Sequence, residues 1–173
     1  MSIFRKRDLS PGNYGTEPVQ PRVAVCFTTP IMTRRAADWL ARLGGCCPLG
    51  ILSDRSEDVI WQCDAENVDL LLLETDFSPA AEDTKDVSAR CDIAIEVRRR
   101  LPECKVYLAC EDGCPEKLPA LDKAVELALI DGYCVGGLTP QQMHAWLIGA
   151  AEAMERRERR REQAYRQDSL PDD

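Results

Sequence analysis

The sequence lacks several features that mark whole classes of protein. No apolar run approaches the roughly 20 residues needed to cross a bilayer. Residues 1–22 also lack the apolar stretch of a secretory signal, so we expect a cytoplasmic protein that makes no membrane contact. Neither a GxGxxG nor a Walker A motif is present. The usual loops for binding the phosphates of a dinucleotide or a nucleoside triphosphate are therefore missing.

Metal-binding and nucleophilic patterns are also missing. The chain has nine cysteines but no CxxC pair, and its closest spacings are Cys46 with Cys47 and Cys110 with Cys114, so no metal site is expected. His144 is the only histidine, and it has no partner pattern for a catalytic triad. Because most cysteines lie in apolar segments, we interpret them as reduced thiols. We expect neither enzymatic activity nor a cofactor.

Charge is unevenly distributed along the chain. The net charge is −8, but residues 23–154 hold 12 basic and 22 acidic side chains, a net charge of −10. Such an acidic body repels phosphate backbones, so no direct contact with nucleic acid is expected. The arginine-rich tract at residues 156–161 could contact an acidic partner, a membrane lipid or nucleic acid. Interspersed glutamates instead favour a solvated helix with intrahelical ion pairs.

From Val23 onward, short apolar runs alternate with amphipathic stretches, as expected for β-α units that form a parallel sheet. The expected strands are 23–27, 49–52, 69–73, 105–109 and 132–135. Helices are expected to begin at Pro30, after Asp54, near Val87, within 118–129 and at Pro140. The third helix should bury Val87, Cys91, Ala94, Ile95 and Leu101. The pattern predicts five β-α units.

The chain is expected to have three parts. Residues 1–21 mix proline, glycine and charge without an apolar period, which predicts a disordered arm. Residues 22–154 form the folded domain. Residues 155–173 continue the last helix as a charged extension and tail. On that helix Met143, Trp146 and Met154 share one face, and we expect them to form part of an interaction surface.

Three segments resemble the receiver domain of bacterial response regulators in order and spacing: DLLLLETD, RRRLPECKVYLAC and ALIDGYCVGG. The resemblance covers about residues 22–152, and its most specific element is Asp131-Gly132-Tyr133. It implies a flavodoxin-like α/β fold, a doubly wound five-stranded parallel sheet of order 2-1-3-4-5, here with an extended C-terminal helix. In the family's terms, Tyr133 occupies the aromatic switch position.

The same resemblance implies that the phosphotransfer residues are missing. The acidic pair that holds magnesium in receiver domains corresponds to Phe27 and Thr28, and the phosphoaccepting aspartate corresponds to Glu74. The conserved hydroxyl corresponds to Ala109, and the lysine to Gly136-Gly137. The resemblance therefore implies a pseudo-receiver with an inactive acceptor position. Glu74 could imitate the phosphorylated state or be an ordinary solvated carboxylate.

Three functions remain open at this stage. The first is a stand-alone pseudo-receiver that regulates a protein partner, or itself, through helix four, strand five and helix five. The second is an atypical phosphoacceptor in a two-component system, with Glu74, Asp76 or Thr75 taking the phosphoryl group. The third is a small-molecule sensor that uses the strand-end cleft. That cleft is expected to comprise Phe27, Thr28, Thr75, Asp76, Ala109 and Gly136.

Overall fold

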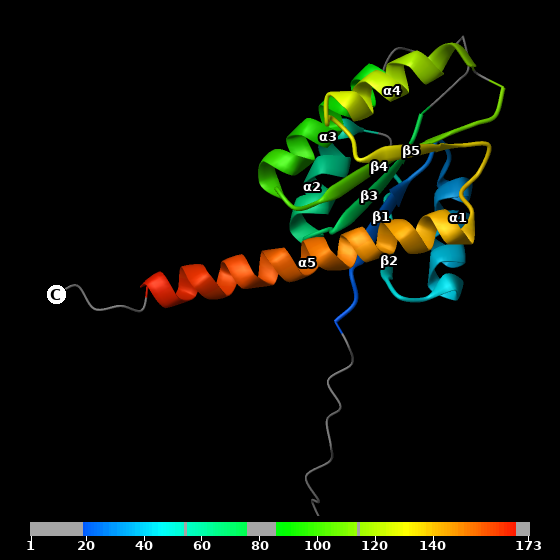
Figure 1. Cartoon of the computed structure of the whole chain (residues 1–173). Coiled ribbons are helices and arrows are strands. Elements are labelled where there is room, and N and C mark those ends of the chain that lie inside the picture. The colour runs from blue at the N-terminus through cyan, green and yellow to red at the C-terminus, as the bar shows by residue number, and fades with distance from the viewer. Residues whose placement is uncertain (1–18, 54, 76–85, 114, 169–173) are drawn as a thin grey trace, which may run out of the picture.

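A computed structural model describes residues 19–53, 55–75, 86–113 and 115–168. Its centre is a parallel sheet of five strands in the order β2-β1-β3-β4-β5 (Figure 1). The strands are β1 (Arg22–Cys26), β2 (Cys47–Gly50), β3 (Leu70–Glu74), β4 (Lys105–Cys110) and β5 (Gly132–Val135). The predicted flavodoxin-like sheet and its strand order are confirmed. Most of the predicted N-terminal arm lies outside the described residues.

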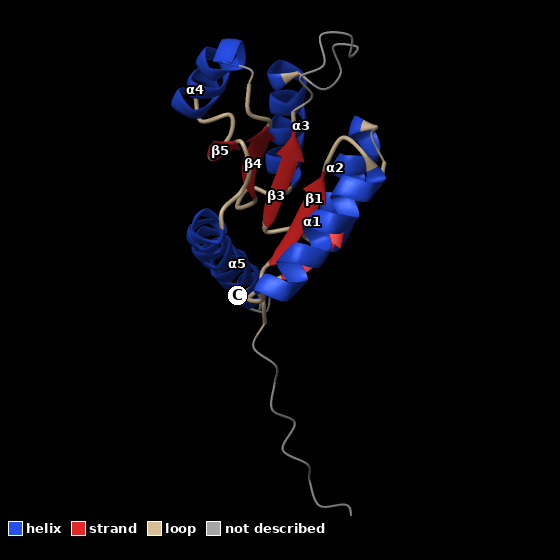
Figure 2. Cartoon of the chain, turned by 90° about the vertical axis from the view of Figure 1, so that its right-hand side faces the viewer, coloured by secondary structure: helices blue, strands red, loops and turns tan. Residues whose placement is uncertain are grey.

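Helices cover both faces of the sheet. They are α1 (Pro30–Leu43), α2 (Ser56–Glu66), α3 (Val87–Arg100), α4 (Leu118–Glu126) and α5 (Pro140–Asp168), with a short 3-10 turn η2 (Pro115–Lys117) before α4. Helices α1 and α5 lie on one face, and α2, α3 and α4 lie on the other (Figures 1 and 2). In the described ranges, no helix combines the length and the apolar character needed to span a bilayer.

The leucine run of β3 is explained by burial on both faces. Successive side chains of a strand point to opposite sides of the sheet. Leu70 and Leu72 therefore join the core under α1 and α5, whereas Leu71 and Leu73 join the core under α2, α3 and α4. A central parallel strand needs apolar side chains in both directions, which is why the run is uninterrupted.

Local sequence signals set most of the element boundaries. The Thr29 side chain accepts a hydrogen bond from the Met32 amide and caps α1, whose first residue is Pro30. Asn67 ends α2 in the left-handed conformation, with φ 51°. Arg55 is the N-cap of α2 and makes no side-chain capping bond. Asp54, after which this helix was predicted to begin, lies outside the described residues.

The expected first and third strands are each displaced by one residue, and two larger details of the prediction are wrong. Strand β2 begins at Cys47, two residues before the expected start, because it pairs in register from Arg22 with Cys47 onward. Pro48 is tolerated there because β2 is an edge strand, where a missing amide donor breaks no inner ladder bond. Ile95 is 46% exposed and lies outside the buried stripe of α3. That stripe instead includes Arg90.

Helix α5 continues without interruption past residue 154, and its arginines contact the domain. The Arg157 guanidinium donates to the Asn67 carbonyl at 2.8 Å and forms an ion pair with the buried Asp69. Arg161 donates to the Asn67 side chain at 2.8 Å, and Arg160 pairs with Glu103 at 2.8 Å. These three arginines of the charged tract therefore hold α5 against the amino-terminal edge of the sheet, so the tract is not simply solvated.

Asp69 is the buried acid of this contact. Burial raises the pKa of its carboxyl group above the usual value. The backbone amide of Arg22, which donates at 2.8 Å, and the Arg157 guanidinium act in the opposite direction. The Arg22 amide and the Arg157 guanidinium therefore favour the charged form of the Asp69 carboxyl group.

The cysteines at described positions carry thiols rather than disulfides. Seven of the eight are buried, and Cys47 is exposed. Burial raises the pKa of Cys63 to about 12 and that of Cys134 to about 11. Because the thiolate is the reactive form, these two side chains act as small core residues rather than as nucleophiles.

Candidate functional site

The carboxyl ends of the inner strands and of β5 meet at one edge of the sheet. The β-sheet register places Cys26 beside Leu73 and Glu74 beside Ala109. Beyond β5, the Gly136 amide donates to the Cys110 carbonyl at 2.9 Å. Ligands of doubly wound folds bind at this edge. The structure thus brings together strand ends that are far apart in the sequence.

Glu74 is held against the end of β1. Its Oε2 atom accepts a hydrogen bond from the Thr28 backbone amide at 2.5 Å. Its own carbonyl oxygen accepts from Nε of Arg90 at 2.9 Å. The first bond turns the carboxylate toward the segment where receiver domains carry their acidic pair. The second fixes the strand end itself.

Arg90 is a site residue that the sequence interpretation missed. It projects from the first turns of α3 and is only 1% exposed. The spacing contained a signal, because positions 87, 90, 91 and 94 fall on one helical face. An arginine on an otherwise apolar stripe indicates a buried polar partner. Here one such partner is the Glu74 carbonyl group.

A magnesium ion does not fit the residues at this strand end. Magnesium takes oxygen ligands in near-octahedral geometry. Phe27 offers no side-chain oxygen, and Thr28 directs an amide hydrogen, not an acceptor, at the Glu74 carboxylate. In the described ranges, no group of three or more His, Cys, Asp or Glu side chains is arranged to hold a metal. The strand ends therefore do not offer a magnesium ion its usual oxygen ligands.

Two other predicted site residues point away from the strand-end opening. Thr75 is 1% exposed, and its hydroxyl group lies 3.2 Å from Sγ of Cys110 and 3.4 Å from the Ala109 carbonyl oxygen. The Tyr133 hydroxyl donates to Asp122 of α4 at 2.5 Å, and this hydrogen bond raises the pKa of Tyr133. Tyr133 is therefore engaged with α4. Asp76 lies outside the described residues.

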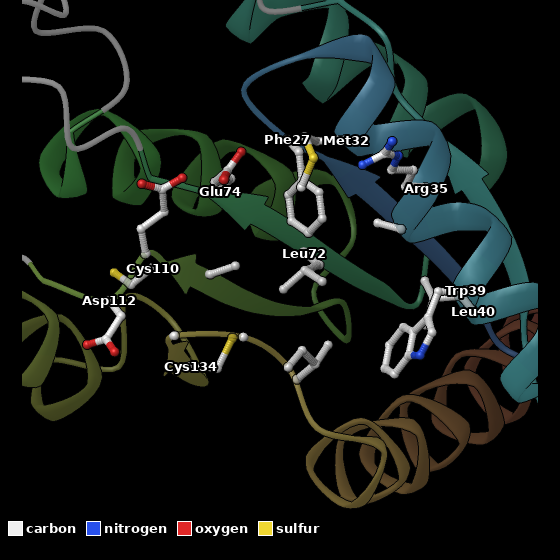
Figure 3. A pocket seen from close by; sticks show the side chains of 16 residues that line it. Phe27, Met32, Arg35, Trp39, Leu40, Leu72, Glu74, Cys110, Asp112 and Cys134 are labelled. Atoms are coloured by element: carbon white, nitrogen blue, oxygen red, sulfur yellow. The ribbon is translucent and has the colours of Figure 1, made fainter.

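A cavity of about 560 Å³ opens beside the strand ends, between α1 and the loop that follows β5 (Figure 3). Its lining residues are Phe27, Met32, Arg35, Ala36, Trp39, Leu40, Leu72, Glu74, Ala109, Cys110, Glu111, Asp112, Cys134, Gly136, Gly137 and Leu138. Three of the predicted cleft residues, Phe27, Ala109 and Gly136, belong to this set together with the acceptor-position residue Glu74, whereas Thr28 and Thr75 do not. The cavity thus extends from the predicted cleft onto the sheet face below α1.

Small side chains leave this space open. Ala109, the second-last residue of β4, has only a methyl group, and Gly136 follows β5 with φ +75°. A Cβ atom at Gly136 would lie 3.4 Å from Cβ of Asp112, and the positive φ would itself strain a larger residue. The wall at this point is therefore formed by the backbone and by the Asp112 side chain.

The predicted interaction surface on α5 needs correction. Met143 is fully buried in the core under α5, so it cannot contact a partner. Trp146 is half-buried and stacks on Tyr107, with ring centroids 4.0 Å apart. Met154 is half-buried. The apolar face of this helix packs on the sheet, and Ile148 points outward instead, 63% exposed.

No protein-family model and no curated protein matches the sequence. Solved structures with a similar fold include an adenylate cyclase from Rhodopirellula baltica, with a TM-score of 0.59 and 8% identity over 85% of this chain and 98% of that one. A response regulator receiver domain from Clostridium thermocellum matches with a TM-score of 0.54 and 15% identity, over 80% and 97%.

A pilus assembly-related protein from Burkholderia pseudomallei matches with a TM-score of 0.56 and 17% identity, over 78% of this chain and 91% of that one. At these identities the similarity shows the fold alone. The chain has the fold of response regulator receiver domains, as the three sequence segments predicted. A fold of this kind carries different functions, so the function has to be argued from the site.

Proposed function

We propose that this chain is a pseudo-receiver that regulates a protein partner, or its own self-association, by contacts that do not depend on phosphorylation. The observation that supports this most strongly is the bond from the Thr28 amide to the Glu74 carboxylate. A backbone donor occupies the place where a phosphotransfer site needs oxygen ligands for magnesium. This function requires no catalysis and no cofactor.

The phosphoacceptor alternative has less support. Transfer to an acceptor needs an accessible oxygen and positive charge to neutralise the phosphoryl group. The Thr75 hydroxyl group is buried. The Glu74 carboxylate already accepts the Thr28 amide, and the family's lysine position is Gly136. Arg35 lines the neighbouring cavity, but from α1 on its far side (Figure 3).

The proposed contact surface lies around β5, which is an edge strand of the sheet. Exposed apolar side chains flank it on α4 and α5 and also occur on the strand itself: Val125, Leu127, Val135 and Ile148. Solvent-exposed apolar groups beside an open strand edge favour association with another protein surface. Tyr133 and Asp122 fix α4 to β5 within this surface.

A pair of matched variants tests the surface. Ile148 on α5 and Ile31 on α1 are both 63% exposed, but only Ile148 lies on the proposed surface. We expect Ile148→Glu to weaken association at least about tenfold, because it places a charge in an apolar contact. Ile31→Glu should leave association unchanged. Sedimentation velocity measures self-association, and crosslinking with mass spectrometry in the source cells maps partner contacts to residues.

The same assays are repeated with magnesium and beryllofluoride. Contacts that map to the β5 surface, are lost in Ile148→Glu and are insensitive to beryllofluoride support the proposal. Contacts that appear only with beryllofluoride would contradict phosphorylation independence. Equal losses in the two variants would show that the β5 surface is not the docking site.

A further inference from the structure

The cavity beside the strand ends has an apolar interior and a charged mouth. Its interior is formed largely by Phe27, Trp39, Leu72, Ala109, Cys134 and Leu138. The volume of about 560 Å³ lies within the range of pockets that hold small organic ligands, roughly 300 to 1,000 Å³. Mostly apolar walls with a few polar groups at one end are typical of such pockets.

Charge at the mouth is unbalanced. Glu74, Glu111 and Asp112 line the cavity together with one cation, Arg35. Figure 3 shows Glu74 and Asp112 on the side of the strand ends and Arg35 across the cavity on α1. The strand-end side therefore presents negative charge to whatever occupies the cavity. The surrounding residues 23–154 are themselves net negative, which adds to this potential.

We propose that this cavity binds a small organic cation with an apolar body, such as an aryl-alkyl ammonium compound. The ammonium group would lie between Glu74 and Asp112, above the small side chain of Ala109. The ring of Phe27 lies beside Glu74 (Figure 3) and offers an aromatic face to the cation. The apolar body would extend over Leu72 toward the Trp39 indole.

The arrangement selects against other ligand classes. A bare divalent cation would lose its water against apolar walls and would face the Thr28 amide hydrogen at Glu74. An anion would meet three carboxylates at the strand-end side. A neutral apolar molecule would fill the interior but bring no positive charge to the carboxylates at the mouth. The inference does not depend on the proposed partner surface, which lies around β5.

Three probes of the same shape separate charge from hydrophobicity: 3-phenylpropylamine, 3-phenylpropan-1-ol and 3-phenylpropanoate. Each is titrated into the full chain at pH 7, and amide NMR shifts are followed at Leu72, Ala109 and Gly136. We expect the ammonium compound to bind roughly fivefold tighter than the alcohol, as expected for partly exposed ion pairs. The carboxylate should bind more weakly than the alcohol.

Variants that remove negative charge then test whether the preference for the ammonium compound comes from the carboxylates at the mouth of the cavity. Glu111 and Asp112 are exposed, so replacing them as Glu111→Gln with Asp112→Asn should leave the fold intact. This pair of changes should reduce the preference for the ammonium compound over the alcohol, with Glu74 retaining part of it, and the affinity for the alcohol should be unchanged. The matched control is Glu116→Gln with Glu126→Gln, which removes two exposed charges that do not line the cavity.

The outcomes are decisive in either direction. The order ammonium, alcohol, carboxylate, with shifts at the cavity residues and sensitivity only to the mouth variant, supports the inference. Equal affinities, a preference for the carboxylate or shifts confined to other parts of the molecule would overturn it. An equal loss in the control variant would show that the preference is a general effect of net charge and would overturn it as well.

Discussion

Replacing Arg157 with methionine should lower the free energy of unfolding by about 3 kcal/mol, a typical cost of breaking a buried ion pair. The Asp69 carboxylate is almost completely buried, and Arg157 is its ion-pair partner from α5. Methionine keeps an apolar side chain of similar length but leaves the carboxylate, among the described residues, with only the Arg22 amide as a hydrogen-bond donor. Urea unfolding followed by circular dichroism measures the loss.

The pH dependence of this loss identifies its cause. Burial already raises the pKa of Asp69 in the folded chain, and removing Arg157 should raise it further. When the pKa of a carboxyl group is higher in the folded state than in the unfolded state, the folded state is destabilised at pH values above the folded-state pKa. The cost falls as the pH is lowered through that pKa, because the native state then binds the proton. The deficit of Arg157→Met should therefore be largest near neutral pH and shrink in acid.

Arg159 provides the control. It is exposed on the same helix, so Arg159→Met should change stability by less than about 0.5 kcal/mol. Asp69→Asn should restore part of the loss when combined with Arg157→Met, because it removes the buried charge. Equal losses of stability in Arg157→Met and Arg159→Met, or a loss in Arg157→Met that does not vary with pH, would contradict the stabilising role of the ion pair between Arg157 and Asp69.

Arg90→Met should destabilise the domain by about 1 to 3 kcal/mol, the cost of removing the donor to a backbone acceptor. Arg90 is 1% exposed, and its guanidinium donates to the Glu74 carbonyl group. Its loss leaves a buried strand-end carbonyl without that donor. The Thr28 amide resonance should shift in the NMR spectrum, because Thr28 bonds to the Glu74 side chain.

Arg99 on the same helix is the matched control. It is exposed and pairs with Glu96 at 2.8 Å, a surface contact that contributes about 0 to 1 kcal/mol. Arg99→Met should therefore cost at most about 0.5 kcal/mol and leave the Thr28 resonance in place. A small loss of stability in Arg90→Met would show that the buried guanidinium is not required to hold the end of β3.

The sheet was predictable because its strands are short and apolar and are bounded by strong signals. The run Leu70–Leu73 is typical of a strand buried on both faces, and β5 was predicted with the ends that the structure shows. Pro30 and Pro140 mark helix starts by a local steric rule that does not depend on tertiary contacts. The predicted start of β2 was two residues too late because the register of this strand depends on its pairing with β1.

The candidate site was only partly predictable. Strand order brings Phe27, Glu74, Ala109 and Gly136 together, and a parallel-sheet pattern is enough to predict that. The size of the cavity depends on how α1 and the loop after β5 lie over the sheet, which periodicity does not determine. The surface prediction failed at Met143 for a related reason. An apolar helix face may pack inward or bind a partner, and the sequence alone did not distinguish these cases.

We propose that this domain with a receiver fold works without phosphorylation. The most direct test is a titration of the full chain with magnesium and beryllofluoride, following the amide resonances of Thr28, Glu74 and Tyr133. Mass spectrometry after incubation with acetyl phosphate accompanies it. We expect no magnesium-dependent shift at Thr28 or Glu74 and no phosphoryl adduct, because the Glu74 carboxylate faces a backbone amide rather than a metal site. Saturable magnesium-dependent shifts at these residues together with an adduct would contradict the account.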